Sequence, residues 1–284
     1  MRIDVVSVPG DPDRTNEDYA GAALTLGGVH GVAVVLDGVT PPADGITGCV
    51  HGVPWFTDRL ANGIVRIAGT SPDTSLANCL DEAVALTALA HLPECDLSHV
   101  HTPQTTVVIV RWDSEQVEYL VLSDSVLLLE GADGAVRAIL ETRLDDVQRK
   151  PEVRALHERF SALPAGSPER AAAFREFGQT VERLRNKRGG FFTAAADPNI
   201  GRYAVTGTEQ RDAVRSAVAL TDGASRWKEM FRLGDWGDLV DVLKKAGPRA
   251  VVEQVRAAEG ADLDRRMFPR FKTHDDASIL CLTL

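Results

Sequence analysis

The sequence predicts an α+β protein in which two antiparallel β-sheets are flanked by helices. Strand patterns open and close the 284-residue chain, and helical patterns lie in pairs between them. Several neighbouring strands are joined by turns that are too short for the crossover connection of a parallel pair. These observations favour antiparallel sheets over a parallel, doubly wound sheet.

Short runs rich in β-branched and other apolar residues, bounded by turn residues, predict the strands. The run at residues 32–36 is apolar on both faces, so we expect it deep in the core, and a turn at Gly27–Gly28 precedes it. The predicted strands are residues 3–8, 19–26, 29–36, 105–112, 117–122, 126–129, 136–140, 190–194, 202–207, 214–220 and 277–284.

Apolar side chains that recur at spacings of three and four residues predict the helices. Val53, Phe56 and Leu60, for example, share one face of the first helix. The predicted helices are residues 51–67, 75–92 and 225–258, the last interrupted near Gly234 and at Gly247–Pro248.

Residues 143–188 differ from the rest of the chain because they are highly charged and helical, with a proline and glycine break at 164–168. We expect one domain over residues 1–284, with this segment as a helical insert. Its charged helices fit two interpretations, a surface for substrates or partners and a solvated amphipathic hairpin that covers the sheet.

Composition and charge narrow the possible functions. A net charge of −10 would repel a phosphate backbone, so we expect no nucleic-acid partner. The N-terminus lacks the apolar core of a signal peptide, and no apolar run reaches the ~18 residues of a membrane-spanning helix. Four scattered cysteines without a CxxC pair do not form a disulfide framework. We therefore expect a cytoplasmic protein with no membrane attachment.

Carboxylates occur in four places at or beside the end of an apolar strand, and two of these places are followed by glycine. A rigid strand fixes a carboxylate in space, and a glycine lets the backbone turn so that its carbonyl approaches a bound ion. Each place alone is also typical of a plain turn or a solvated loop. Together they suit Mg²⁺ or Mn²⁺, which prefer oxygen ligands. The four places are Glu17–Asp18, Asp37–Gly38, Asp222–Gly223 and Asp275–Asp276.

This ordered set resembles the motifs of the protein phosphatase 2C family, the PPM-type metal-dependent serine/threonine phosphatases, in a bacterial-like form. The resemblance covers nearly the whole chain and implies a four-layer α-β-β-α sandwich. The matching segments are Arg14…Glu17-Asp18, Asp37-Gly38, Thr105-Thr106, Ser123-Asp124-Ser125, Thr221-Asp222-Gly223 and Asp275-Asp276-Ala277-Ser278.

The resemblance also implies a binuclear centre of Mn²⁺ or Mg²⁺, between which the sequence does not distinguish. Asp37 would bridge the two ions, and Asp222 and Asp275 would complete the first site. Glu17 and the Gly38 carbonyl would hold the second ion.

Four further residues have roles implied by the same resemblance. Asp18 and Asp276 would act behind the ligands or through water. Asp124 corresponds to a position that helps to hold a weaker third ion in many bacterial members. Arg14 would clamp the phosphate of the substrate.

The function implied is a monomeric hydrolase that removes phosphate from phosphoserine and phosphothreonine in protein substrates. A water activated by the two metal ions would attack phosphorus, with no covalent phosphoenzyme. Two alternatives remain open: a phosphatase for small phosphate esters, and a catalytically weak or inactive phosphatase fold that serves as a binding or regulatory module.

Three departures from the family pattern affect this interpretation. The family's Asp-Gly-x-Gly-Gly loop is replaced after Gly38 by Val39-Thr40-Pro41-Pro42, which is bulkier and stiffer. Arg14 lies three residues before Glu17, where the family's phosphate-binding arginine lies four before. The family's Gly-Asp-Ser-Arg has Ser123 for its glycine and Val126 for its arginine, which weakens the case for a third ion at Asp124.

Cysteines and histidines outside this set form no familiar metal pattern. The segment after the second predicted helix is rich in histidine and carboxylates, but its spacing matches no known zinc motif, so we interpret it as a solvated loop. Cys49 and His51 are interpreted as capping and packing residues at a helix start. The residues of the histidine-rich segment are His91, Glu94, Cys95, Asp96, His99 and His101.

Overall fold

The computed structural model describes residues 1–25, 29–42, 45–91, 93–164 and 166–284, and its strands form two sheets. The expected turn at Gly27–Gly28 lies outside these residues. The strands are β1 (Arg2–Val8), β2 (Tyr19–Leu24), β3 (Gly31–Leu36), β4 (Val107–Trp112), β5 (Gln116–Leu122), β6 (Val126–Gly131), β7 (Val136–Ile139), β8 (Val205–Gln210), β9 (Val214–Leu220) and β10 (Ala277–Thr283).

Helices cover the outer faces of both sheets and also form the insert. Two short 3-10 turns, η1 (Ile200–Tyr203) and η2 (Arg211–Ala213), flank β8. The helices are α1 (Val53–Thr70), α2 (Leu76–His91), α3 (Arg143–Gln148), α4 (Pro151–Ala162), α5 (Pro168–Glu182), α6 (Asp222–Glu229), α7 (Trp236–Ala246) and α8 (Pro248–Ala261). In the described part of the chain, none of them is long and apolar enough to cross a membrane.

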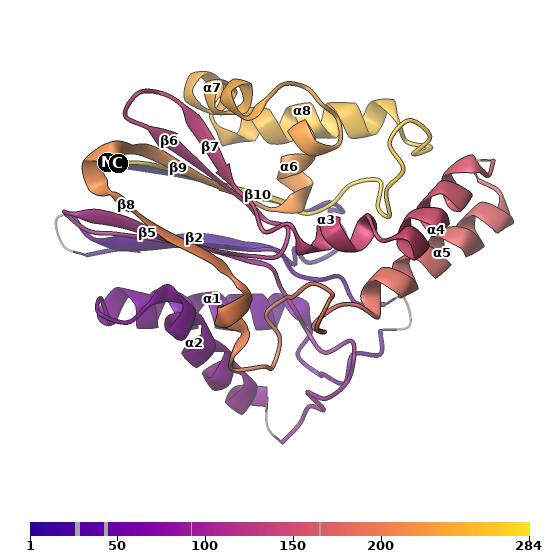
Figure 1. Ribbon diagram of the computed structural model, residues 1–284, viewed down its shortest axis with the longest axis horizontal. Helices are drawn as coiled ribbons and strands as arrows, with labels where there is room; N and C mark the ends of the chain where they lie inside the picture. The colour runs from indigo at the N-terminus through magenta and orange to yellow at the C-terminus, as the bar shows by residue number, and fades with distance from the viewer. Residues whose placement is uncertain (26–28, 43–44, 92, 165) are drawn as a thin grey trace.

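The two sheets stack face to face, with α1 and α2 on one outer face and α6, α7 and α8 on the other (Figure 1). One sheet has the strand order β1-β10-β9-β6-β7 and the other β2-β3-β4-β5-β8. Every strand pairing described is antiparallel. The predicted α+β class and the four-layer sandwich are therefore confirmed.

Three apolar clusters separate the four layers. Ile64 belongs to the cluster beneath α1 and α2, Leu127 to the cluster between the sheets, and Trp227 to the cluster beneath α6, α7 and α8. Strand β3 is buried at all six positions because its alternate side chains serve two clusters: Val34 faces the first and Val35 the second. This agrees with the expectation that its apolar run lies deep in the core.

The insert forms α3, α4 and α5, of which α4 and α5 extend beyond one end of the sandwich (Figure 1). A separate apolar cluster that includes Phe160 and Phe177 holds it together. The ring of Phe271, from the loop before β10, lies 3.9 Å from the ring of Phe174 between centroids. The insert is therefore packed against the loop that leads into β10.

Two predicted strands differ from the observed ones. Residues 190–194 make only single bridges, Phe191 with Arg185 and Ala194 with Thr105, so the apolar run is buried without becoming a strand. The strand predicted at 202–207 begins later, at Val205, because η1 occupies the residues before it. Short apolar runs do not distinguish these cases by pattern alone.

The layer between the sheets should account for much of the stability. Leu127 is fully buried there, and replacing it with alanine should reduce the free energy of unfolding by about 2–5 kcal/mol through lost contacts and a residual cavity. Urea denaturation would measure the change. The matched control is Leu89→Ala on α2, where the side chain is 64% exposed and a change within about 0.5 kcal/mol is expected. Equal losses in the two variants would contradict this account of the core.

Candidate active site

The antiparallel pairing brings the ends of four strands to one end of the sandwich. Strand β2 begins where β3 ends, since Tyr19 pairs with Leu36, and β9 ends beside the start of β10, since Leu220 pairs with Ile279. A hydrogen bond joins the two sheets here: the backbone N–H of Asp222 donates to Asp37 Oδ2 at 3.2 Å. The acidic motifs predicted from the sequence therefore meet in space.

Carboxylates crowd around Asp37. Desolvation by the surrounding protein, followed by the negative charges of Asp222 and Asp18, raises the pKa of Asp37 well above its usual range. Desolvation and the neighbouring Asp275 raise the pKa of Asp222 to about 7. Asp18 accepts a hydrogen bond from the Thr221 hydroxyl at 2.9 Å through Oδ2, but its buried Oδ1 has no partner among the described residues. Such a cluster fits divalent cations, which would offset the repulsion.

Two basic residues contact Asp275 directly, and the sequence analysis did not identify them. Arg226 Nη2 donates to Asp275 Oδ2, and Lys272 Nζ donates to Asp275 Oδ1, both at 2.6 Å. Lys272 also donates to the Thr40 hydroxyl at 2.5 Å, and Thr40 donates to Glu17 Oε2 at 2.5 Å. The available signal was the position of Arg226, one helical turn after Asp222.

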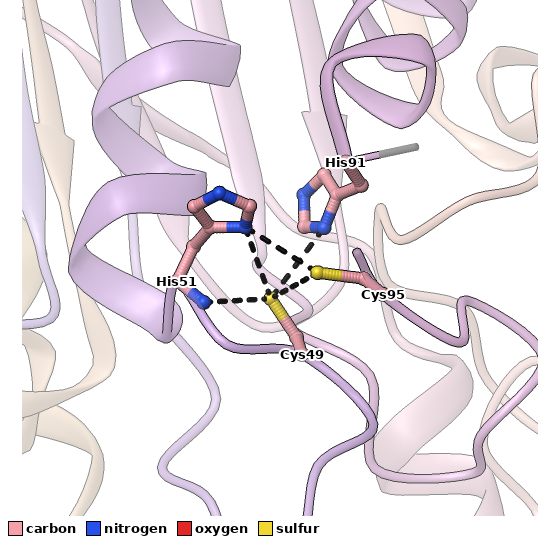
Figure 2. Close-up of side chains that lie close together, drawn as sticks. All are labelled: Cys49, His51, His91 and Cys95. Carbon is pink, nitrogen blue, oxygen red and sulfur yellow. Dashed lines mark hydrogen bonds between the residues drawn. The ribbon is translucent and has the colours of Figure 1, made fainter. Parts of the chain in front are cut away.

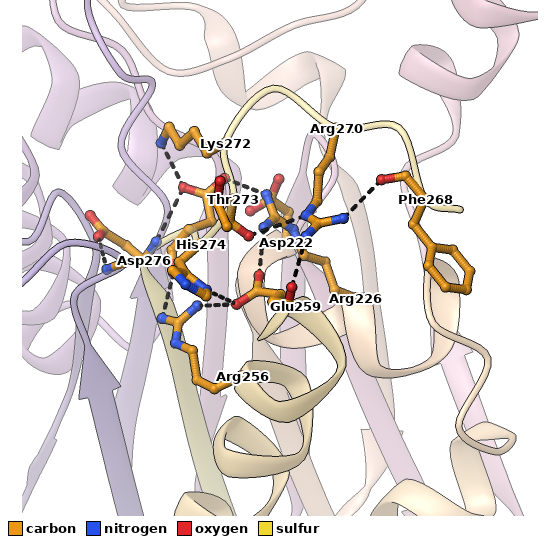
Figure 3. A network of polar contacts seen from close by, with 12 residues as sticks. Asp222, Arg226, Arg256, Glu259, Phe268, Arg270, Lys272, Thr273, His274 and Asp276 are labelled. Carbon is orange, nitrogen blue, oxygen red and sulfur yellow. Dashed lines mark hydrogen bonds and ion pairs between the residues drawn. The ribbon is translucent and has the colours of Figure 1, made fainter. Parts of the chain in front are cut away.

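A buried network fixes the position of Asp275 (Figure 3). Glu259, which is fully buried, accepts hydrogen bonds at 2.8 Å from Arg226 and from Arg256, and His274 Nδ1 lies 2.8 Å from it. Arg256 also donates to the backbone carbonyl of Asp275 at 2.6 Å. Both the side chain and the backbone of this aspartate are therefore held by residues of α6 and α8.

The loop before β10 is held in shape by Arg270. Its guanidinium is buried and donates to the Asp262 carboxylate at 2.8 Å and to the backbone carbonyls of Asp262 and Phe268 at 2.8 and 2.9 Å. Because Asp262 is also buried, the pair is desolvated and depends on these hydrogen bonds. The loop that carries Lys272 and Asp275 is therefore well ordered by its own contacts.

Solved structures, but not sequences, resemble this protein: no protein-family model and no curated protein matches the chain. The serine/threonine phosphatase Stp1 from Staphylococcus aureus is 11% identical, with 100% of this chain and 95% of that chain covered and a TM-score of 0.56. PppA of Pseudomonas aeruginosa, a key regulatory component of T6SS, is 17% identical, with 99% and 96% covered and a TM-score of 0.55. The chain has the protein phosphatase 2C fold.

A third structure with this fold is the catalytic domain of the serine/threonine protein phosphatase PstP in complex with 2 manganese ions. It is 13% identical, with 99% of this chain and 96% of that chain covered and a TM-score of 0.53. These similarities confirm the family resemblance at the level of fold. The positions of the individual side chains come from the geometry of this chain.

Within the protein phosphatase 2C fold, Asp37 and Gly38 are held by their backbone. The Thr105 hydroxyl donates to the Asp37 carbonyl at 2.8 Å, and the Asp37 N–H donates to the Thr106 hydroxyl at 3.2 Å. A Cβ added to Gly38 would lie 2.5 Å from both the Glu17 carbonyl oxygen and a methyl group of Val53. Only glycine fits there, and its backbone lies against Glu17, the other residue expected at the second ion.

Asp276 holds the N-terminal loop against the end of the chain. Its Oδ1 accepts from the backbone N–H of Gly10 at 2.8 Å and its Oδ2 from that of Glu17 at 2.6 Å. Both oxygens are thus engaged by the backbone, which suits a residue that positions Glu17. Arg14 is exposed on the same loop and lines a narrow cleft with Glu17 and Lys272.

The turn that carries Asp124 departs from the family pattern in its backbone. Ser123, where the family has glycine, has a φ of 68°, in the left-handed region that favours glycine. Its hydroxyl donates to Asp124 Oδ1 at 3.1 Å. Desolvation raises the pKa of Asp124, while the charge of Arg185, from the insert, lowers it. Asp124 therefore faces the junction between the sandwich and the insert.

Without metal ions, the acidic cluster should make the protein less stable as the pH rises. The pKa of Asp222 is raised from 3.8 to about 7, so its contribution to stability is fully present below pH 3.8 and is lost as the pH rises through 7. We expect the free energy of unfolding in EDTA to fall between about pH 5 and pH 7, measured by urea denaturation. Asp222→Asn should flatten part of this fall, and saturating Mn²⁺ should also reduce it. A metal-free stability that rises across this window would contradict the argument.

Proposed function

We propose that this protein is a metal-dependent phosphatase that hydrolyses phosphoserine and phosphothreonine in protein substrates. The observation that supports the proposal most directly is the convergence of Asp37, Asp222 and Asp275 from the ends of two sheets, in a protein phosphatase 2C fold. The similar PstP domain is in complex with 2 manganese ions. The raised pKa values of Asp37 and Asp222 support a cation between these carboxylates.

In this proposal, two Mn²⁺ or Mg²⁺ ions are held by the converging carboxylates. Asp37 would contact both ions, Asp222 and Asp275 the first, and Glu17 with the Gly38 carbonyl the second. When bound, the ions supply positive charge beside the phosphoryl oxygens and activate a water for attack. Asp124 is left for a weaker third ion.

The remaining residues of the site position and neutralise these groups. Asp18, with Thr221, lies behind Asp37 and Asp222, while Asp276 fixes the loop of Glu17. Arg14 and Lys272 line the narrow cleft, so their positive charges are placed to bind the phosphate of a substrate. Arg14 makes no hydrogen bond within the described chain, which leaves its guanidinium available.

A protein substrate is supported by a second cavity, formed where the insert meets the sandwich. Its volume is about 410 Å³, and Arg143, Lys150 and Arg188 line it beside two stacked aromatic rings, Phe192 and Tyr203. Positive charge next to an apolar wall suits a phosphorylated peptide better than a small phosphate ester. We propose that this cavity binds residues that flank the phosphorylated side chain.

A catalytically weak or regulatory module is the second candidate, and Lys272 is the observation that favours it. Its ammonium lies 2.6 Å from Asp275 Oδ1, so an internal cation already neutralises part of the acidic cluster. A protein that relied on Lys272 in place of a metal ion would keep the fold without turnover. Activity measurements separate the two candidates.

Removing a central carboxylate should abolish turnover. Asp37→Asn and Asp222→Asn should each lower kcat for p-nitrophenyl phosphate in Mn²⁺ by roughly a thousandfold or more, because several kcal/mol of transition-state stabilisation depend on the ions. Circular dichroism should show a retained fold. Asp241→Asn, an exposed carboxylate on α7, is the matched control and should keep full activity. A wild-type chain that cleaves neither this ester nor any phosphopeptide across a Mn²⁺ titration would rule out the enzyme and favour the regulatory module.

The cavity of the insert should affect peptides and not small esters. Arg188 is exposed and has no ion-pair partner in the described chain, so Arg188→Glu should raise KM for an acidic phosphopeptide several-fold, by about 1 kcal/mol of lost attraction. KM for p-nitrophenyl phosphate should stay the same. Arg175→Glu, an exposed arginine of α5 outside the cavity, is the control. An equal change for both substrates would argue against a peptide-binding role.

A further inference from the structure

Four metal-binding side chains meet outside the carboxylate site, at the ends of α1 and α2 (Figure 2). Cys49 and His51 lie in the loop just before α1, His91 is the last residue of α2, and Cys95 lies in the loop that follows it. One potential ligand atom from each of the four lies within 4.8 Å of the other three. The helical hairpin thus brings together two pairs that are about 40 residues apart.

The spacing of these atoms matches a tetrahedral zinc site. Zinc bonds of about 2.3 Å to sulfur and 2.0–2.1 Å to nitrogen place neighbouring ligand atoms roughly 3.3–3.8 Å apart. The two sulfur atoms are 3.5 Å apart, and Cys95 Sγ lies 3.4 Å from His51 Nδ1. Cys49 Sγ lies 3.5 Å from His91 Nδ1 and 3.8 Å from His51 Nδ1. All four separations are close to this range.

We propose that Cys49, His51, His91 and Cys95 form a structural Zn²⁺ site, separate from the catalytic carboxylates. Thiolate and imidazole ligands select zinc over magnesium and manganese. Four protein ligands complete the tetrahedron and leave no open position for a substrate, which distinguishes a structural site from a catalytic one.

The surroundings of both histidines are those of metal ligands. The second ring nitrogen of His51, Nε2, faces the Glu94 carboxylate at 3.6 Å, and a carboxylate behind a histidine is the usual arrangement at zinc sites. The His51 ring is stacked on Trp55, with centroids 4.1 Å apart. The His91 ring is 1% exposed, and its Nε2 has no partner among the described residues, so its polar contact is through the nitrogen that faces Cys49.

The same geometry argues against two simpler interpretations. A disulfide between Cys49 and Cys95 would bring the sulfur atoms to about 2.05 Å and would leave both imidazoles pointing at an uncharged bond. Apolar packing does not explain two histidines turned toward two thiols. The sequence gave no warning because Cys-x-His and His-x₃-Cys, separated by a helical hairpin, match no familiar zinc spacing.

A zinc ion here would fix the loop that leads away from the catalytic centre. Cys49 stands at the far end of the loop that follows Asp37–Gly38, the loop in which bulky residues replace the family's glycines. Next to it, the Asp96 N–H donates to the Gly48 carbonyl at 2.7 Å, so the loops that carry Cys49 and Cys95 are already joined. The zinc site would thus tie one rim of the carboxylate centre to the α1–α2 hairpin.

The first test measures zinc in the purified chain. The Asp37→Asn/Asp222→Asn double variant serves as the background, because the carboxylate centre itself could take zinc. After dialysis against EDTA, elemental analysis should find one zinc ion per chain in this background. Adding Cys95→Ser should remove it, and adding Cys281→Ser, a free cysteine elsewhere in the fold, should not.

Cobalt substitution gives a readout that is independent of activity. Co²⁺ added to the metal-free background protein should produce a thiolate-to-cobalt charge-transfer band and intense visible bands of tetrahedral cobalt, both saturating at one equivalent. The carboxylate centre contains no sulfur and cannot give the first band. If Cys95→Ser fails to fold, this titration of the parent protein still decides.

Three outcomes would overturn the proposal: a folded parent protein that retains no zinc and shows no charge-transfer band, a cobalt spectrum without thiolate character, or a Cys49–Cys95 disulfide found by peptide mapping of protein purified under reducing conditions. Zinc retained equally in Cys95→Ser would also overturn it.

Discussion

Repulsion among carboxylates that are held close together and away from bulk water is the constraint on which the rest of this structure depends. Asp37, Asp222 and Asp18 are brought to one point by the ends of β3 and β9 and the start of β2, and their pKa values are raised as a result. Folding can hold like charges together only if other groups offset them. In this chain Arg226 and Lys272 offset part of the charge at Asp275, and the proposed divalent ions would offset the remainder.

The surrounding structure is arranged to keep these groups in place. Thr105 and Thr106 hold the backbone of Asp37, and the Glu259 network holds Asp275 from two sides. Side chains fixed by hydrogen bonds to buried partners lose little freedom when a ligand binds, which favours a preorganised site. The insert joins this arrangement through Phe271, which neighbours Lys272 and packs on α5, so substrate contacts at the insert can influence the loop that carries Asp275.

Much of the fold and the principal acidic residues could be predicted from the sequence, for physical reasons. A strand that is apolar on both faces and ends in Asp-Gly defines both a core element and a fixed carboxylate, as β3 and Asp37 illustrate. Arg226 and Lys272 were missed because basic residues near acidic ones are common on any surface. The 190–194 segment was mistaken for a strand because burial and strand pairing leave the same apolar pattern. The Cys49–His91 contact depends on helix packing, which local spacing does not encode.

The central claim is that these carboxylates hold a pair of divalent cations. Anomalous scattering from crystals soaked in Mn²⁺ tests it most directly, because the map locates manganese without reference to activity. The account predicts two strong peaks that share Asp37, one next to Asp222 and Asp275 and the other next to Glu17 and the Gly38 carbonyl. A map with no peak beside Asp37 at saturating Mn²⁺, with Lys272 still bound to Asp275, would contradict it.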